Sequence, residues 1–152
     1  MTRIIIGSDH RGLLLKEEIK LYLIEEGYQI IDNGCYTDKS CDYPEIAESV
    51  CKAIHNEEEK GILICGTGIG MSIKANRFCH IRCALCSNEL MSEMSRKHNN
   101  ANVIALGSNI TDSKTACNIV NIFLKTEFEG GRHLKRINKL NYKVTKDIAD
   151  IL

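Results

Sequence analysis

The sequence contains no tryptophan and a single proline, and neither shortage restricts the fold class. Charge of one sign is also lacking: 20 basic residues balance 20 acidic ones, so there is no footprint typical of binding to nucleic acid or to an anionic membrane. No apolar run approaches the roughly 18 residues that span a bilayer. The apolar stretch near the N-terminus is too short for a secretory signal. We therefore expect a cytoplasmic protein that contacts neither membrane nor nucleic acid.

Cysteine, by contrast, is abundant, with eight residues in 152. Without a secretory signal these should be reduced thiols, most of them small buried groups. Three of them, Cys79, Cys83 and Cys86, have the CxxxCxxC spacing of some iron–sulfur enzymes. Residues 82–86 have the pattern of a strand, however, in which Cys83 and Cys86 would face opposite sides of a sheet about 10 Å apart. We therefore expect no metal cluster there, and no zinc site, since a second pair of ligands is missing.

Strand-like and helix-like segments alternate along the whole chain, and its length suits one domain, 1–152. Short β-branched runs that read as strands occupy residues 3–7, 29–32, 61–65, 82–86 and 102–106. Amphipathic segments that read as helices occupy residues 11–26, 44–54, 69–77, 89–98 and 112–125, and the tail at 134–152 is helix-like with mixed charge.

Continuous apolar strands that alternate with amphipathic helices indicate βαβ units and a parallel sheet covered on both faces. We predict an α/β fold: a single Rossmann-like αβα sandwich with a five-stranded parallel sheet and a C-terminal helix. Ligands of such folds lie beyond the carboxyl ends of the strands. The residues to inspect are therefore those at the strand ends, 7–10, 65–68 and 107–109.

The segment after the third predicted strand is rich in glycine, with Gly66, Gly68 and Gly70 at alternate positions. Glycine lets main-chain amides approach a ligand, and the start of a helix favours negative charge. The plain alternative is a tight turn that serves packing alone. Met71 stands where a dinucleotide fingerprint needs glycine and where a cysteine-dependent phosphatase loop needs arginine. Residues 7–12 have P-loop glycine spacing, but no lysine follows.

Cys65 lies at the mouth of this glycine-rich turn. A thiolate is favoured at the start of a helix and could serve as a nucleophile or a general base. Taken alone, a cysteine at a strand end is more commonly a buried apolar residue.

Basic residues gather near the C-terminus, where Arg132 and Arg136 would share one face of a helix, with His133 beside them. Two guanidinium groups suit a phosphate dianion. The alternative is a solvated basic start of a helix. His10 and His98, at the ends of a predicted strand and a predicted helix, would individually be ordinary polar surface residues.

Together these segments resemble the type B ribose-5-phosphate isomerase family, which also includes galactose-6-phosphate isomerase subunits. The matching segments occur in family order and cover essentially the whole chain: residues 7–12 (GSDHRG), 42–44 (DYP), 61–70 (GILICGTGIG), 74–77 (KANR), 95–99 (SRKHN) and 130–133 (GGRH). The resemblance implies an enzyme of the pentose phosphate pathway that interconverts ribose 5-phosphate and ribulose 5-phosphate. It implies no metal and no organic cofactor, and a homodimer or tetramer whose active site is shared between subunits.

The resemblance also assigns catalytic roles to individual residues. Cys65 would move a proton between C2 and C1 of the open-chain sugar through an enediolate. Thr67 would help to move the hydroxyl proton. His98 would help to open the sugar ring, and Asp9 would bind or protonate at the ring end.

Substrate-binding residues follow from the same resemblance. The enediolate would be stabilised by the main-chain amides of Gly66, Gly68 and Gly70. Hydroxyl groups would be held by the side chains of Asp42, Tyr43 and Asn99. The phosphate would be held by His10, Arg132 and Arg136.

Two positions refine the resemblance. Some relatives replace the strand-end cysteine by serine and use a glutamate one turn later, where this chain has Met71, so it resembles the cysteine-base subgroup. Many relatives carry arginine at the position of Asn109, where this chain keeps hydrogen bonding but loses a charge. Alternative functions are the same chemistry on a six-carbon sugar phosphate such as allose or galactose 6-phosphate, a non-catalytic sugar-phosphate sensor, and a low-molecular-weight phosphatase.

Overall fold

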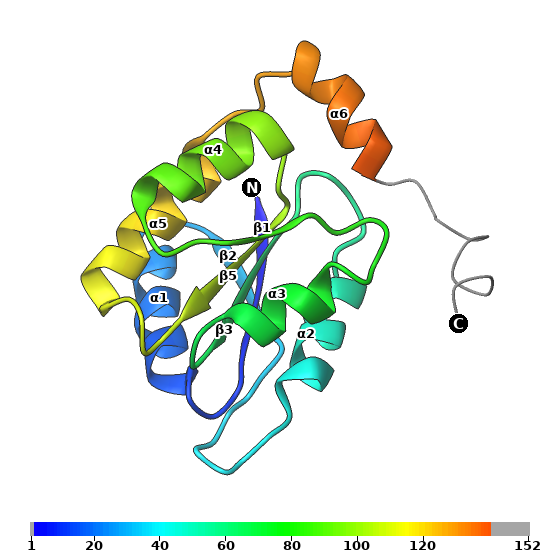
Figure 1. Ribbon diagram of the computed structural model, residues 1–152. Coiled ribbons are helices and arrows are strands. Elements are labelled where there is room, and N and C mark those ends of the chain that lie inside the picture. Colours follow the sequence, from blue (N-terminus) through cyan, green and yellow to red (C-terminus); the bar gives the residue numbers. More distant parts are fainter. Residues whose placement is uncertain (1, 141–152) are drawn as a thin grey trace, which may run out of the picture.

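The computed structural model describes residues 2–140, which form one twisted sheet with helices on both sides (Figure 1). The strands are β1 (Arg3–Ser8), β2 (Gln29–Asp32), β3 (Lys60–Cys65), β4 (Cys83–Leu85) and β5 (Val103–Gly107). The helices are α1 (Leu13–Glu25), α2 (Tyr43–Lys52), α3 (Ile69–Ala75), α4 (Glu89–Asn99), α5 (Ser113–Lys125) and α6 (Arg132–Leu140). Within residues 2–140, no helix combines the length and the apolar character needed to cross a bilayer.

The strand order is β2-β1-β3-β5-β4, and every neighbouring pair is parallel. This arrangement confirms the five-stranded parallel sheet and the α/β fold predicted from the sequence. Each crossover between parallel strands needs a helix, which is why strand and helix patterns alternate along the chain.

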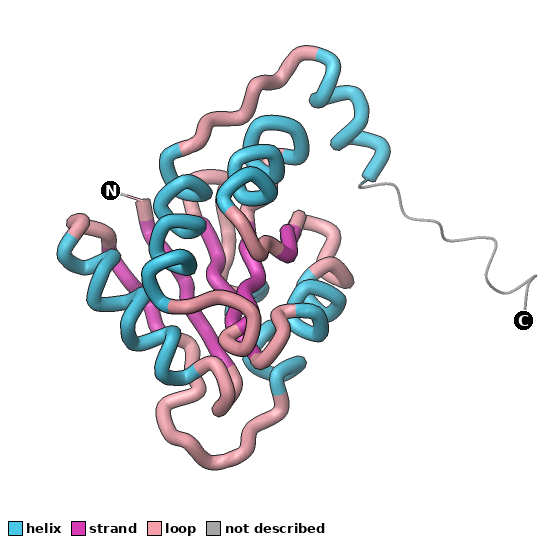
Figure 2. The backbone as a smooth tube through the Cα atoms, turned by 60° about the vertical axis from the view of Figure 1, so that its left-hand side comes forward, coloured by secondary structure: helices cyan, strands magenta, loops and turns pink. Residues whose placement is uncertain are grey.

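Helices cover both faces of the sheet (Figure 2), and alternating side chains of the strands supply two separate cores, one on each face. Ile4 and Ile6 point to the face covered by α1 and α5, whereas Ile5 points to the face covered by α2 and α3. The apolar residues predicted for α5 are fully buried, and those predicted for α1 and α2 are buried or partly buried against the same cores. Cys65 belongs to the α2–α3 side.

Most predicted elements differ from the structure by one or two residues at an end, and the fourth strand and the last helix are the cases that bear on the site. The fourth strand is only three residues long, because it is an edge strand paired with β5 alone. Cys83 and Cys86 nevertheless pack into opposite cores, as expected of residues three apart in a strand. The last helix begins at Arg132, two residues earlier than predicted, and the rest of the predicted tail helix, 141–152, lies outside the described residues.

A buried lysine joins α1 to the segment that follows β2. The Lys16 side chain is fully buried, and its Nζ donates hydrogen bonds to Asp32 Oδ1 at 2.8 Å and to the Cys35 carbonyl at 2.5 Å. Asp32 also accepts from Lys20 at 2.6 Å. Burial alone would raise the pKa of Asp32, but these two hydrogen bonds outweigh it and hold the pKa below its ordinary value.

We predict that Asp32→Asn lowers the free energy of unfolding by about 3 kcal/mol at pH 7, because the buried ammonium of Lys16 loses its closest counter-charge and keeps only the exposed Glu17 at 3.6 Å. The folded-state pKa of Asp32 is depressed, so its contribution is complete above about pH 4 and is lost as the pH falls through the folded value. Urea unfolding of both proteins between pH 3 and pH 7 measures the difference. Glu26→Gln, at an exposed partner of Lys125, is the control and should change stability by less than about 0.5 kcal/mol; equal stability of Asp32→Asn and the parent protein at pH 7 would refute the prediction.

Candidate active site

The sheet reverses its winding direction between β1 and β3. The chain goes from β1 to β2 on one side, and from β3 to the edge strand β4 and back to β5 on the other. The carboxyl ends of two such strands diverge into separate turns, which leaves a crevice between them. Ser8 at the end of β1 is in register with Ile64 of β3. The turns that begin at Asp9 and at Gly66 therefore lie on either side of this crevice.

The sulfur of Cys65 lies at the boundary between the core and this crevice. Its side chain is largely buried, and its Sγ accepts a hydrogen bond from the main-chain amide of Gly68 at 3.1 Å. The turn can take this shape because Gly68 has a φ of 77°, a conformation that other residues rarely adopt. A side chain at Gly68 would also collide with the Leu106 backbone. The turn therefore directs an amide donor at the thiol.

Asp9 forms the opposite wall of the crevice. It is largely buried, and its Oδ1 accepts hydrogen bonds from the amides of Arg11 and Gly12, both at 3.0 Å. These bonds close the turn between β1 and α1 and fix the orientation of the carboxylate. The orientation of Asp9 is therefore set by the local backbone.

A pocket of about 540 Å³ opens between these two turns. The ring of Tyr43 crosses it and packs so closely on Gly70 that an added Cβ there would lie 2.5 Å from the ring. The Thr67 hydroxyl is exposed and accepts a hydrogen bond from the Ile69 amide at 3.3 Å. The predicted site residues that line this pocket are Asp9, Tyr43, Cys65, Gly66, Thr67 and Gly70.

Three other predicted residues belong to the same region without lining the pocket. His10 follows Asp9, and its Nδ1 accepts a hydrogen bond from the Cys41 amide at 3.3 Å. Asp42 is the N-cap residue of α2, directly before Tyr43. Gly68, through its positive φ, sets the bend of the turn after β3. The structure thus gathers nine of the predicted residues at one edge of the sheet.

One residue of the pocket was missed by the sequence analysis. Arg11 lines it together with Asn109, and both side chains lie close to Gly66, since an added Cβ there would lie 3.2 Å from Asn109 Nδ2 and 3.3 Å from Arg11 Cδ. Arg11 lies within a matching family segment, but nothing in a linear pattern indicates that its side chain reaches the third strand.

The remaining predicted residues form a second group at the other end of the molecule. His98 and Asn99 end α4, and together with Arg136 of α6 they line a pocket of about 260 Å³. Arg132 and Arg136 are exposed on α6, which confirms that both are helical. His133, expected beside them, is instead buried, because it stacks on His98 with a 4.3 Å distance between ring centroids.

The environment of His133 favours its neutral form. Burial, together with the charges of Arg132 and His98, lowers the pKa of His133 below its ordinary value. A neutral ring can stack on His98 without charge repulsion. The contact therefore orients the His98 ring, and His133 does not join the two arginines as a third cation.

A metal is one further possibility for this group. The donor atoms of His98, Glu129 and His133 lie within 4.8 Å of one another. The two imidazole planes differ by only 13°, however, so the in-plane lone pairs of the rings run nearly parallel and do not converge on one ion. The stack thus favours ring packing over chelation.

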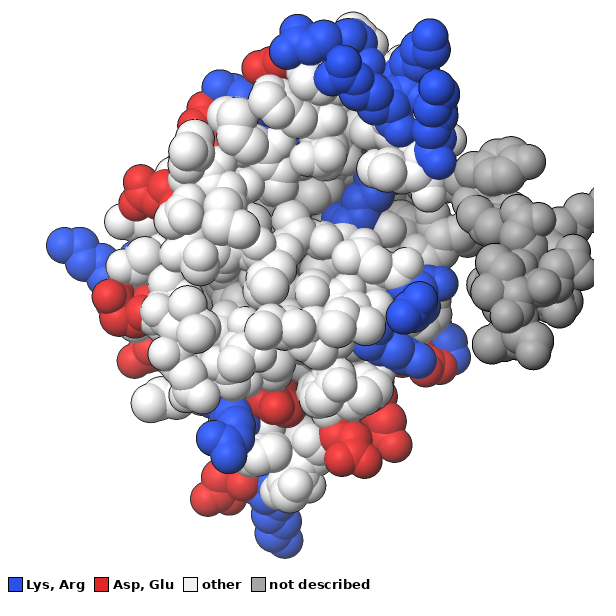
Figure 3. Space-filling view, in the orientation of Figure 1, with Lys and Arg blue, Asp and Glu red and all other residues white. Residues whose placement is uncertain are grey.

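The two groups of predicted residues do not share a pocket within one chain. Helix α6 packs on the end of α4 and stands apart from the sheet (Figure 1). Figure 3 shows basic side chains gathered at the α6 end, and a mostly uncharged surface in the middle of the same face. Helix α3 lies at the front in this orientation (Figure 1), and its Ile69 and Ile73 side chains are exposed.

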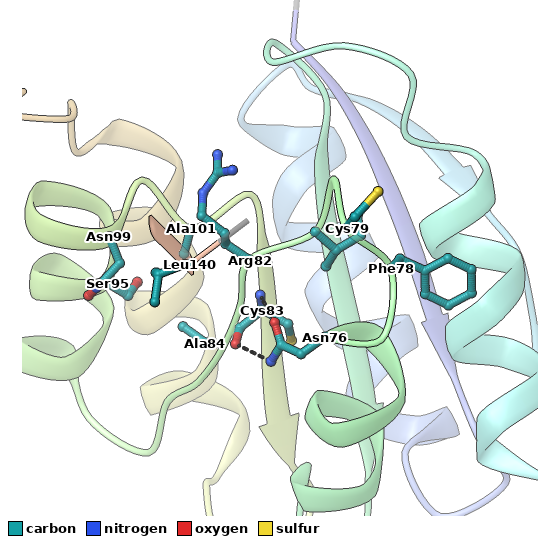
Figure 4. Close-up of a pocket in the computed structure, with 11 residues that line it drawn as sticks. Asn76, Phe78, Cys79, Arg82, Cys83, Ala84, Ser95, Asn99, Ala101 and Leu140 are labelled. Atoms are coloured by element: carbon teal, nitrogen blue, oxygen red, sulfur yellow. Dashed lines mark hydrogen bonds between the residues drawn. The ribbon is translucent and has the colours of Figure 1, made fainter. Parts of the chain in front are cut away.

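A hollow of about 520 Å³ lies between the edge strand β4, the end of α4 and the last residue of α6 (Figure 4). The Asn76 side chain accepts a hydrogen bond from the Cys83 amide at 2.8 Å and donates one to the Cys83 carbonyl at 2.9 Å. It thereby satisfies the free edge of β4 in place of another strand. Asn99 and Leu140 line both this hollow and the pocket beside His98.

Comparison with known proteins identifies the family. Residues 4–140 match the model of the ribose/galactose isomerase family. Ribose-5-phosphate isomerase B of Escherichia coli is 43% identical, with 92% of this chain and 95% of the relative covered. D-erythrulose-4-phosphate isomerase of Pectobacterium atrosepticum is 38% identical over 93% of this chain and 95% of its own. The crystal structure of a ribose 5-phosphate isomerase from Thermotoga maritima superposes with a TM-score of 0.90 at 46% identity, covering 92% of this chain and 97% of the other. The chain belongs to the ribose/galactose isomerase family.

Proposed function

We propose that this protein is an aldose–ketose isomerase that interconverts ribose 5-phosphate and ribulose 5-phosphate. The observation that carries the proposal is the crevice at the winding reversal of the sheet, where the amide-bonded thiol of Cys65 faces a pocket lined by Asp9 and Thr67. The relatives named ribose-5-phosphate isomerase B support the choice of substrate. All eight cysteines are free thiols, which suits a reducing compartment, and we propose the cytoplasm.

In the proposed mechanism Cys65 is the base. Its thiolate removes the proton from C2 of the open-chain aldose and returns it to C1, and the amide of Gly68 stabilises the sulfur while it carries negative charge. The main-chain amides of the glycine-rich turn stabilise the developing enediolate oxygen. Thr67, exposed at the same pocket, relays the hydroxyl proton.

Ring opening and phosphate binding are assigned to the second group of residues. His98, held by the His133 stack, assists opening of the furanose ring. Arg132 and Arg136 hold the phosphate dianion together with His10, and Asn99 joins Asp42 and Tyr43 at the hydroxyl groups. These roles need both groups around one substrate, although one chain keeps them in different pockets.

We therefore propose a homodimer, or a tetramer built from it, in which the α6 end of one chain completes the Cys65 pocket of the other. Three observations support this arrangement: α6 stands apart from its own sheet, Arg136 and Cys65 line different pockets, and the face between them is mostly uncharged. Twofold symmetry would form two such sites at once.

Arg11 offers a replacement for the charge that is missing at position 109. It lines the pocket beside Asn109, and a guanidinium there can bind a phosphate or an anionic intermediate. We propose that Arg11 performs this role in the present chain.

The first prediction tests the base. Cys65→Ala should lower kcat for ribose 5-phosphate at least ~10²-fold, because the proton at C2 has no other acceptor. Coupled detection of ribulose 5-phosphate measures the rate, and the same assay with four- and six-carbon sugar phosphates ranks kcat/KM by chain length. Cys51→Ala is the matched control: Cys51 lies in the same core, but burial raises the pKa of its thiol to about 12, and its removal should leave kcat within about twofold. Full activity of Cys65→Ala would remove Cys65 from the mechanism.

The second prediction tests the shared site. Cys65→Ala and Arg136→Ala should each be nearly inactive alone, yet unfolding and refolding them together should restore activity. Random pairing would give about one quarter of the parent activity, since half of the dimers are mixed and each mixed dimer has one intact site. A refolded mixture as inactive as its components would exclude a site shared between subunits.

The third prediction concerns Arg11. Arg11→Gln should raise KM for ribose 5-phosphate about tenfold with a smaller change in kcat, because it removes binding charge and leaves the base intact. The double variant Arg11→Gln/Asn109→Arg should recover most of this loss, as it places the cation at a neighbouring position beside Gly66 in the same pocket. Lys114→Gln, on the exposed surface of α5, is the control. No rescue by the double variant, or an unchanged KM for Arg11→Gln, would contradict the assigned role.

A further inference from the structure

The segment between β2 and α2, residues 33–42, is fastened at both ends to the carboxyl end of β1. At its start, the Cys35 amide donates to the Ser8 carbonyl and the Ser8 amide donates to the Gly34 carbonyl, both at 2.5 Å. At its end, the Cys41 amide donates to His10 Nδ1 at 3.3 Å. Ser8 and His10 are two residues apart, so the two attachment points are separated by at most ~7 Å.

This attachment brings two cysteines together. A disulfide needs Cα atoms about 4.4 to 6.8 Å apart, and bonding to residues only two apart holds the main chains of Cys35 and Cys41 beside the same strand end. The thiols also interact: burial, followed by the neighbouring Cys35 thiol, raises the pKa of Cys41 to about 11. Two thiols influence each other in this way only when their side chains are adjacent.

The surroundings leave this pair both accessible and able to move. Cys35 and Cys41 are partly exposed, whereas Cys51, Cys65 and Cys86 are buried. The five residues between the pair, 36–40, are all exposed, so their backbone can adjust while the sulfur atoms approach. The buried Nζ of Lys16 holds the Cys35 carbonyl, which makes Cys35 the fixed partner and Cys41 the one that moves.

We propose that Cys35 and Cys41 form a reversible disulfide, a modification site whose oxidation weakens substrate binding at the neighbouring pocket; the consequence for binding rests on the proposed function. The oxidant is a low-molecular-weight disulfide such as oxidised glutathione. The Cys35 thiolate attacks one glutathione sulfur and releases one glutathione thiol. The Cys41 thiolate then attacks the sulfur of Cys35 and releases the second. The protein loses two electrons and two protons, and one oxidised glutathione becomes two reduced ones.

Formation of the bond changes the substrate-binding edge of the pocket. Cys41 is followed directly by Asp42 and Tyr43, and the Tyr43 ring lies against Gly70 over the pocket of Cys65. Movement of Cys41 toward Cys35 withdraws its amide from His10 and shifts this ring. Cys65 itself, on β3, is untouched. Oxidation should therefore raise KM at least about fivefold while kcat changes by less than about twofold.

The experiment uses the full chain in buffers of reduced and oxidised glutathione, read by two independent measurements. Trypsin cleaves after Lys39, between the two cysteines, so the disulfide joins peptides 21–39 and 40–52; fragment spectra before and after reduction distinguish Cys41 from Cys51, which the second peptide also contains. We expect the linked peptide to form with a rate that rises with pH from 7 to 9, because the closing thiol must ionise. Reduction should restore the original KM.

Matched variants separate this site from other thiols. Cys35→Ser and Cys41→Ser should each abolish the linked peptide and the redox response of KM, whereas Cys117→Ser, which removes another partly exposed thiol, should retain both. Glutathione adducts without the linked peptide, or a linked peptide with unchanged KM, would overturn the proposal. A reduced protein that forms the linked peptide but lacks isomerase activity would refute the proposed function and leave the disulfide established.

Discussion

The pairing of β1 with β3 is the constraint on which the rest of the site depends. Hydrogen bonding continues beyond the ends of the strands: the Asp9 amide donates to the Ile64 carbonyl, and the amides of Ser108 and Asn109 donate to Cys65 and Gly66. Three turns from distant parts of the sequence are thereby joined through their main chains. The main chain thus fixes the positions of the Cys65 thiol, the Asp9 carboxylate and the Gly68 amide. A site held by regular main-chain structure is positioned more precisely than one held by loops alone.

The buried Lys16 fixes a second part of the candidate site, the segment between β2 and α2. An ammonium removed from water costs several kcal/mol unless it is fully paired, so such a residue contributes little net stability compared with an apolar one. Its contribution is to fix the position of the chain segment that it bonds. Its two acceptors, Asp32 and the Cys35 carbonyl, lie at the end of β2 and in the following loop. That loop contacts His10 through the Cys41 amide and continues into Asp42 and Tyr43. The edge proposed to bind substrate is thus held by a charge pair, and the edge that carries Cys65 is held by the sheet.

Local patterns in the sequence predicted the elements, the parallel sheet and the edge at which the candidate site lies. They succeeded because apolar periodicity reports burial directly, as in α5, and because the carboxyl ends of parallel strands coincide. Predictions from the sequence failed where contacts between residues distant in the sequence determine the position of a side chain. Lys16 looks like an ordinary polar residue of a helix, Arg11 gives no sign that it reaches Gly66, and His133 lies between two arginines in sequence but is turned inward by its stack on His98.

The division of the candidate site between a rigid sheet edge and an outlying helix has a chemical consequence. An enediolate that carries a phosphate readily eliminates it, so the intermediate needs a closed environment. In the proposed assembly the cations of α6 and the ring of His98 arrive with the second chain, and the same contact that binds the phosphate also covers the base. Removal of the partner would then uncover the thiol and withdraw the phosphate ligands together. Catalysis would depend on protein concentration through assembly, and a folded single chain would hold every catalytic residue without being a catalyst.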